Sequence, residues 1–394
     1  MRKRARVAQS KGDHRGFNSN DFISRMPDDI LVSIVSRLPL KEAATTSNLS
    51  TRWRYIWCQT DGLDFDANEK LDKIAVDSKL RVVERPKYIN WVNRVTRQHK
   101  GPTIDEFRIC FDLDKSSKGA IDKWVEFAIS KRVQKLELDL LENGEMLRQP
   151  PRNYVFPIKI FDRSLGLSVK RQSLSVPRMV SGKEMEIKFL KSLFLKCVNV
   201  SEEALRKLLT SCPALQQLSI HGSGDLISCC ISHLQILTLD IYRPEENIKF
   251  LSFPELPKLK QLILKVGAWD DDSLLEFTSL AKACPNLQRF VIQLIWMSPA
   301  KRRRKIRHAA KHPHQHLEVV EVVGYYGRTS DVELAVYFID NAIALQKILI
   351  DPRYQVLERI PIGNDQLKKE KAARSCAKKQ LEPRTPRGVQ LVIL

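Results

Sequence analysis

The stretch Leu259-Lys260-Gln261-Leu262-Ile263-Leu264 places apolar residues at the first, fourth and sixth positions of a six-residue unit. Alternation along a strand would turn the fourth and sixth residues into a core and the fifth toward the opposite, concave surface. The unit recurs along the chain. Its other copies begin at Val133, Leu190, Leu215, Leu234, Leu287, Leu317 and Leu345. From Leu190 onward, successive copies start roughly 19–30 residues apart, which predicts a stack of similar strand-containing units.

The segments between these units show helix signals. Ser201 precedes an apolar pattern that ends at Cys212-Pro213, and Asp272-Ser273 precedes one that ends at Cys284-Pro285. Ser330 and Glu333 have the spacing of a capping box. Alternating short strands and helices at this period predict an α/β leucine-rich-repeat solenoid.

Near the N-terminus, residues 22–57 carry three short helix signals and two tryptophans. Pro27 suits a first helical turn, Asp28 and Asp29 follow it, and Pro39 ends the apolar pattern. A segment this short and apolar cannot build a large core of its own. From the pattern alone, it either finishes its core on a partner protein or packs as a small bundle against itself or the next domain.

The order of motifs in this block resembles an F-box. The motifs are Met26-Pro27-Asp28-Asp29-Ile30-Leu31, Arg37-Leu38-Pro39 and Leu49-Ser50-Thr51-Arg52-Trp53-Arg54. Residues 316–327, 333–335 and 341–348 are similar to the FBD segment. The F-box motifs, the repeats and the FBD-like segment occur in the same order as in the plant F-box/leucine-rich-repeat/FBD family, and the chain resembles that family. The resemblance implies an α/β leucine-rich-repeat solenoid preceded by a small all-α helical F-box module.

The family resemblance also implies a function. The expected protein is a non-catalytic substrate-recognition subunit of an SCF-type cullin ubiquitin ligase, which binds a Skp-family adaptor and an unknown protein substrate. The implied adaptor-binding residues are Pro27, Ile30, Leu31, Ile34, Leu38, Pro39, Leu40, Leu49 and Trp53. Some of these must fill the module's own core, and the sequence does not separate the two sets. The candidate substrate-binding residues are the middle strand positions Phe194, Ser219, Thr238, Ile263 and Val291.

The expected organisation has six parts. A disordered basic tail covers residues 1–20, the F-box covers 21–66, and a helical linker covers 67–103. Leucine-rich repeats cover 104–310, with degenerate copies around 140–185, and the FBD segment with the last repeats covers 311–362. A basic tail covers 363–394, and its apolar end is expected to add a strand or to dock on the last repeat.

The charge balance favours acidic partners. The formal net charge is +20, with 66 Lys and Arg against 46 Asp and Glu. One internal basic run is a candidate nuclear-import or polyanion patch, with a solvated loop as the alternative. It contains Lys301, Arg302, Arg303, Arg304 and Lys305. An alternative function is therefore a basic repeat scaffold that binds nucleic acid or acidic partners without recruiting a ligase, although no recognition helix supports nucleic acid.

No catalytic pattern is evident, so we expect no enzymatic activity and no cofactor. His308, His312, His314 and His316 lie close together, but the sequence lacks a His-Glu-x-x-His motif there and Pro313 interrupts a helix. We interpret this segment as a flexible loop and expect no metal. Cys212 and Cys284 precede prolines at helix ends and are interpreted as structural. No apolar run reaches the roughly 20 residues of a membrane span, and we expect a nuclear or cytoplasmic location.

Overall fold

The computed structural model describes residues 23–140, 153–157, 187–221, 233–241, 255–268, 273–296, 305–353 and 364–394. The predictions for residues 1–20 and for most of 140–185 lie outside this part of the chain. The chain divides into two compact units, Met1–Thr60 and Asp61–Leu394. Each unit has its own core and is described separately below.

The first unit is helical. Its elements are η1 (Ile23–Arg25), α1 (Asp28–Val35), α2 (Leu40–Thr45), η2 (Thr46–Asn48), α3 (Trp53–Ile56) and η3 (Trp57–Gln59). Pro27 and Pro39 immediately precede α1 and α2, where their fixed φ favours a helix start and their missing N–H costs nothing. Leu31, Val35 and Ile56 are almost completely buried between these short helices.

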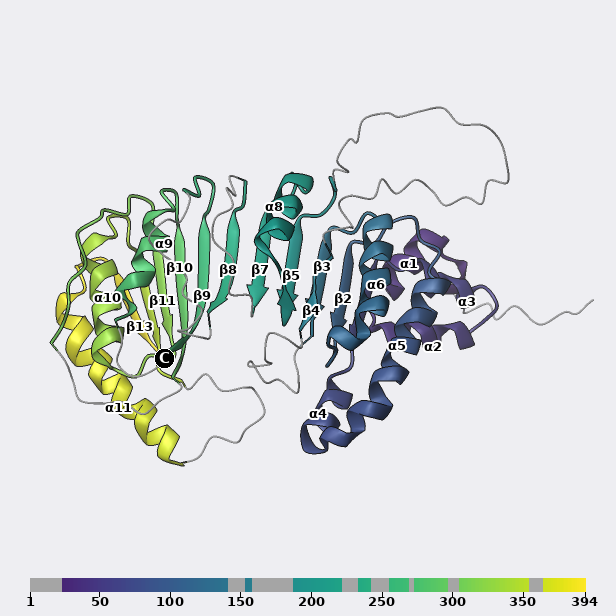
Figure 1. The fold of residues 1–394 in the computed structure, drawn as a ribbon, viewed down its shortest axis with the longest axis horizontal. Coiled ribbons are helices and arrows are strands. Elements are labelled where there is room, and N and C mark those ends of the chain that lie inside the picture. The colour runs from purple at the N-terminus through teal and green to yellow at the C-terminus, as the bar shows by residue number, and fades with distance from the viewer. Residues whose placement is uncertain are drawn as a thin grey trace, which may run out of the picture. The chain divides into compact units, whose positions relative to one another are not determined.

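The described residues of the second unit form an eleven-stranded parallel sheet. In sheet order the strands are β1 (Gly62–Asp66), β2 (Glu106–Cys110), β3 (Lys135–Asp139), β5 (Ser192–Lys196), β7 (Gln217–His221), β8 (Ile236–Ile241), β9 (Gln261–Ala268), β10 (Arg289–Trp296), β11 (Val319–Val323), β12 (Lys347–Asp351) and β13 (Gln390–Ile393). A separate pair joins β4 (Tyr154–Val155) to β6 (Val198–Asn199). The strands of the large sheet follow chain order and lie side by side (Figure 1).

The strand register aligns equivalent positions of the repeated unit. Leu262 and Leu264 of β9 pair with Phe290 and Ile292 of β10, and all four side chains are at most 1% exposed. Two continuous apolar rows therefore run across the sheet, and their burial is its main source of stability. The predicted alternation is confirmed, with the fourth and sixth positions of the unit in the core.

Helices connect most of the parallel strands. They are α4 (Asn68–Val76), η4 (Ser78–Leu80), α5 (Arg81–Gln98), η5 (Lys115–Ser117), α6 (Lys118–Ser130), α8 (Glu202–Ser211), η8 (Leu274–Phe277), α9 (Thr278–Lys282), α10 (Thr329–Asn341), α11 (Asn364–Leu381) and η9 (Glu382–Arg384). Crossovers between parallel strands are almost always right-handed, so a sheet that grows in one direction collects them on one face. Figure 1 shows α6 and α8 over the same face, and the opposite side is called the open face.

The predicted boundary between linker and repeats at residue 104 was placed too late. Strand β1 lies in the sequence assigned to the F-box block, pairs with β2, and forms the edge of the sheet. The helices of residues 67–103 connect β1 to β2 and are therefore part of the second unit. The sequence concealed this because Leu63 and Phe65 occupy the two core rows without the preceding leucine of the repeat.

The C-terminal residues form structure and are not a tail. Strand β13 pairs with β12, which confirms the expected terminal strand. Helix α11 packs through buried Ala373 and Ala377, and its Cys376 Sγ would lie 2.7 Å from a Cβ at Gly327. Glycine at position 327, where φ is +72°, therefore gives this helix room to pack closely.

The predicted capping box of α10 was wrong. The helix begins at Thr329, and the Arg328 backbone N–H donates a hydrogen bond of 3.1 Å to Asp331 Oδ2. Ser330 and Glu333 are instead buried, and Glu333 accepts hydrogen bonds from Ser273 Oγ, at 3.1 Å, and from the Arg307 backbone N–H. Glu333 thus serves tertiary contacts, while the N-cap of the helix is Arg328, two residues before the predicted Ser330.

Candidate functional site

An exposed apolar stripe marks the helical first unit. Ile30 and Ile34 are 46% and 43% exposed, and they lie four residues apart on one face of α1. Leu38, in the turn after α1, is 39% exposed, and Leu49 is 67% exposed. We call Ile30, Ile34, Leu38 and Leu49 the exposed stripe. Moving apolar side chains out of water lowers the free energy, so the exposed stripe is suited to contact with a protein partner.

The structure separates the predicted adaptor-binding residues into two sets. Leu31, Leu40 and Trp53 are at most 6% exposed and belong to the module's own core. Pro27 and Pro39 are exposed and lie beside the exposed stripe in sequence. These two prolines and the four residues of the stripe are therefore the ones available for contact in the free chain, whereas the buried three support the module.

An ion pair within the first unit holds the start of α1. Arg52 donates hydrogen bonds from Nε and Nη2 to Asp28 Oδ1 at 2.9 and 2.6 Å, and from Nη2 to the Met26 carbonyl. Both side chains are partly exposed, so the energy is modest and the main effect is on geometry. The contact fixes Pro27 and the first turn of α1, which carry part of the candidate surface.

The predicted substrate-binding residues form one continuous row on the open face. Phe194 pairs with Ser219, Ser219 with Thr238, Thr238 with Ile263, and Ile263 with Val291. Phe194 and Ile263 are half-buried, whereas the other three are at most 9% exposed. The sheet thus brings all five together, and Phe194 and Ile263 offer the most surface.

On strands β1, β2 and β3 the open face is held by internal ion pairs. The Arg108 guanidinium lies 3.2 Å from Asp64, 3.3 Å from Asp66 and 3.1 Å from Glu137. Burial raises the pKa of Asp64, and the charge of Arg108 offsets this only in part. These three carboxylates are therefore paired with Arg108 of β2.

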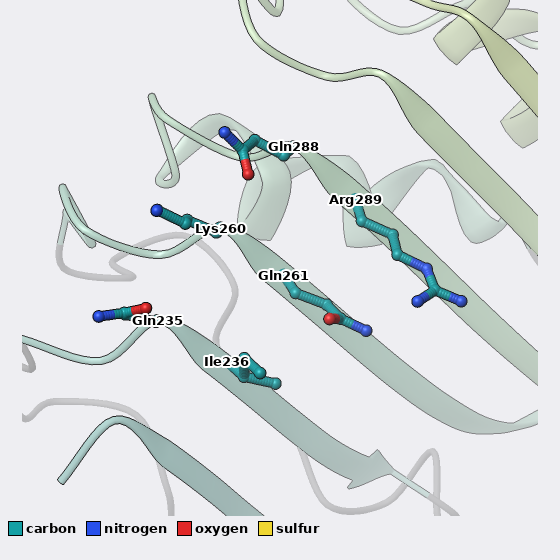
Figure 2. Close-up of a pocket in the computed structure, with 6 residues that line it drawn as sticks. All are labelled: Gln235, Ile236, Lys260, Gln261, Gln288 and Arg289. Carbon is teal, nitrogen blue, oxygen red and sulfur yellow. The ribbon is translucent and has the colours of Figure 1, made fainter.

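A pocket of about 320 Å³ opens where strands β8, β9 and β10 begin. It is lined by Gln235, Ile236, Lys260, Gln261, Gln288 and Arg289, which we call the glutamine pocket. Figure 2 shows these side chains in two rows. Gln235, Lys260 and Gln288 precede the three strands, and Ile236, Gln261 and Arg289 are the first strand residues, which share the open face with the middle positions.

Sequence reasoning missed the glutamine pocket, although a signal was present. Its residues are the second and third positions of three consecutive units, as in Leu234-Gln235-Ile236-Leu237. The unit is defined by its first, fourth and sixth positions, so its second and third positions carry no weight in that definition. Reading the same position down successive copies gives glutamine, lysine and glutamine, and then isoleucine, glutamine and arginine.

The interpretation of the histidine segment as a flexible loop needs correction. His314 is 5% exposed, its Nε2 lies 3.1 Å from the Tyr337 hydroxyl, and its main chain bridges to Ala342. Burial, with smaller contributions from His312 and Lys282, lowers the pKa of His314 to about 4. This histidine is therefore a core residue.

Two other sequence interpretations concern thiols and the basic run. Cys212 and Cys284 are at most 1% exposed, and burial raises the pKa of each thiol to about 12, which fits the structural role. Lys305 is exposed, while Lys301, Arg302, Arg303 and Arg304 lie outside the described residues. In the described part of the chain, no group of three or more His, Cys, Asp or Glu side chains could hold a metal ion. The same residues contain no helix with the length and hydropathy of a membrane span.

Comparison with known families agrees with both units. Residues 23–62 match the F-box domain, and residues 95–245 and 227–394 match the leucine-rich-repeat domain described as At1g61320/AtMIF1. The chain is 25% identical over 350 residues to the FBD-associated F-box protein At5g38590 of Arabidopsis thaliana, covering 86% of this chain and 77% of that protein. The chain belongs to the plant F-box/leucine-rich-repeat/FBD family.

Other members of the F-box/leucine-rich-repeat/FBD family in Arabidopsis thaliana match in part. The F-box/LRR-repeat protein At3g59200 is 28% identical over 283 residues, which are 68% of this chain and 50% of that protein. The F-box/FBD/LRR-repeat protein At4g00160 is 27% identical over 274 residues, which are 69% and 51%. Two relatives at 30% identity are covered over 38% and 42% of their length. The match thus spans about half or less of these four proteins.

Proposed function

We propose that this protein is the substrate-recognition subunit of an SCF-type cullin ubiquitin ligase. The F-box would bind a Skp-family adaptor, and the repeats would bind a protein substrate. The observation that carries the proposal is the exposed stripe of Ile30, Ile34, Leu38 and Leu49 on a module that matches the F-box domain. These four aliphatic side chains, which are 39–67% exposed in the free chain, would be removed from water on docking.

The proposed role is that of a receptor without catalytic chemistry of its own. Holding the substrate beside a ubiquitin-carrying subunit would raise the effective concentration of the reacting groups. The buried thiols Cys212 and Cys284, with pKa values raised to about 12, are poor candidates for a thioester-forming residue, which needs an accessible thiolate. The repeats would then contribute a binding surface, and the continuous row of middle strand positions on the open face supports this role. A nuclear or cytoplasmic site of action is part of the same proposal.

The adaptor-binding part can be tested with Ile30, Ile34 and Leu38 changed together to Ser. A purified Skp-family adaptor should bind the natural chain, and its affinity for this triple variant should fall by about 100-fold or more, because three apolar contacts of about 1 kcal/mol each are lost. Isothermal titration calorimetry would measure the two dissociation constants.

A matched control removes exposed apolar groups elsewhere. Val76 and Val82 are 91% and 79% exposed in the second unit. Their double change to Ser should leave adaptor affinity unaltered, and thermal unfolding of all three proteins should coincide. Equal adaptor affinity for the Ile30/Ile34/Leu38 variant would overturn the proposal. If the natural chain bound no adaptor but bound nucleic acid with a steep salt dependence, the basic-scaffold alternative would replace it.

A further inference from the structure

The glutamine pocket differs chemically from the matching positions of other repeats. Along the strand starts of β2, β3 and β5, Gln134 donates to Asp105 at 2.6 Å and accepts from Lys191 at 2.8 Å. Lys135 donates to Glu106 at 2.6 Å in the next row. Polar side chains at these positions of the sheet thus bond to one another.

The glutamine pocket lacks this internal pairing. Among the described residues, the side chains of Gln235, Gln261 and Gln288 have no hydrogen-bonding partner, and Lys260 has no carboxylate within ion-pair distance. The backbone groups, in contrast, are satisfied, because Lys260 N–H donates to the Gln235 carbonyl and Gln288 N–H to the Lys260 carbonyl, each at 2.8 Å. Only the side chains remain available to a ligand.

The charge of the pocket is positive. Lys260 contributes a full ammonium charge, and Arg289 contributes a guanidinium that is 45% exposed. Glu321 lies 2.6 Å from Arg289 and offsets one of the two charges, but it contacts Nε and Nη2 and leaves Nη1 without a bond to it. Three neutral amides surround these cations and supply further donors.

Such an arrangement suits an oxyanion. A carboxylate accepts up to about four hydrogen bonds, and bonds to charged donors are shorter and stronger than neutral ones. Amide side chains also pair with the N–H and C=O groups of an extended peptide, which a free inorganic ion lacks. The volume of about 320 Å³ fits one acidic side chain with its flanking backbone.

We propose that the glutamine pocket binds an acidic side chain, Asp or Glu, on an extended segment of the protein substrate. The inference rests on the proposed receptor function and adds the chemical class of the substrate segment. The pocket shares the open face with Ile263 and Val291, so a segment held there would also reach the middle row.

The test uses the full chain and a fluorescein-labelled eight-residue peptide of alternating Asp and Gly. Its matched peptide replaces Asp by Asn, and a third carries phosphoserine in place of Asp. Fluorescence anisotropy at 0.15 M salt should show that the Asp peptide binds and the Asn peptide binds at least about tenfold more weakly. Binding of the phosphoserine peptide alone would overturn the carboxylate assignment.

Variants locate the binding site. Lys260→Gln with Arg289→Gln should weaken the Asp peptide by at least about tenfold, equal to about 1.4 kcal/mol. Glu321→Gln should strengthen it, because the competing carboxylate is gone. The matched control, Lys118→Gln with Lys368→Gln, removes the same charge from α6 and α11 and should have no such effect. An equal loss in the control would show a diffuse charge effect and sink the proposal.

The two proposals fail separately. The Lys260/Arg289 variant should retain full affinity for the Skp-family adaptor, because the pocket belongs to the second unit. Loss of peptide selectivity with intact adaptor binding would leave the receptor function standing and reject only the acidic segment. Absence of adaptor binding with intact peptide selectivity would reject the receptor function and leave only the binding of an acidic segment by the pocket.

Discussion

Two sets of polar side chains lie on the open face of the sheet, one on strands β1, β2 and β3 and one in the glutamine pocket. The first set is paired with neighbouring side chains, and the second is largely unpaired among the described residues. Arg108 lies within 3.3 Å of three carboxylates from the two neighbouring strands, β1 and β3, whereas Lys260 has no such partner among the described residues. The repeat therefore fixes where polar groups stand, and the identity of the neighbouring residue decides whether they stabilise the sheet or remain open to a ligand.

The largest expected stability effect lies next to the paired region. Asp112 follows β2 and has a fully buried side chain, which binds Arg81 at 2.7 Å and Arg85 at 2.6 Å. Asp112→Ala would remove one charged partner from each of two mostly buried guanidinium groups, although Arg85 would keep Asp114 at 2.8 Å. Breaking a buried pair from one side typically costs about 3–5 kcal/mol. Urea unfolding would measure the loss.

The matched control for Asp112 is an exposed ion pair. Asp365 is 90% exposed and lies 3.5 Å from Lys368. Asp365→Ala should change stability by less than about 0.5 kcal/mol. If Asp112→Ala were equally mild, pairing in the N-terminal strands would not be the stabilising device that the comparison assumes.

A pH-dependent effect is expected beyond the pocket, near α10. The pKa of His314 is lowered from 6.5 to about 4, so the unfolded chain takes up a proton in this range while the folded chain does not. Stability should therefore fall as the pH drops from about 6.5 to about 4, by roughly 2–3 kcal/mol for this group. Thermal unfolding against pH, with His314→Phe as the comparison, would measure the contribution.

The buried imidazole of His314 is removed in the comparison variant. The His314→Phe variant should lose the part of the pH dependence between about 4 and 6.5 that belongs to this imidazole. If the difference in melting temperature between pH 7 and pH 5 were the same in this variant as in the natural chain, the pKa of His314 would not be lowered in the fold.

The smallest expected effects compare the two regions directly. Arg108→Gln should destabilise the chain by about 1–2 kcal/mol, because Asp64, Asp66 and Glu137 then repel one another. Lys260→Gln should cost less than about 0.5 kcal/mol, because no described carboxylate depends on it. Urea unfolding of both variants checks the contrast, and similar losses would remove the distinction between paired and open positions.

Local pattern predicted much of the fold. The six-residue units predicted strands β3, β5 and β7 to β12 with their two buried rows, since a period of two along a strand needs no knowledge of other segments. The start of the sheet was misplaced because β1 carries only part of the unit. The capping box of α10 was misread because Glu333 bonds to Ser273, 60 residues away.

The candidate sites were predicted less completely. The F-box motifs identified the right segment, yet their pattern could not show that Leu31 and Trp53 are buried while Ile34 and Leu49 are exposed. The periods of helices only four to eight residues long are too brief to separate an inner face from an outer one. Packing between the helices makes that choice.

By itself, the sequence determined the order of the units, the core positions of each repeat and the family. Those features depend on neighbours within a few residues, which periodicity records. Only the tertiary structure decided which side chains stay exposed on the helical module, and that Gln134 is paired while Gln235 and Gln288 are open. The partners of Gln134, Asp105 and Lys191, precede the adjacent strands and lie 29 and 57 residues away in the chain, so register across the sheet, and not local pattern, decides which side chains are paired.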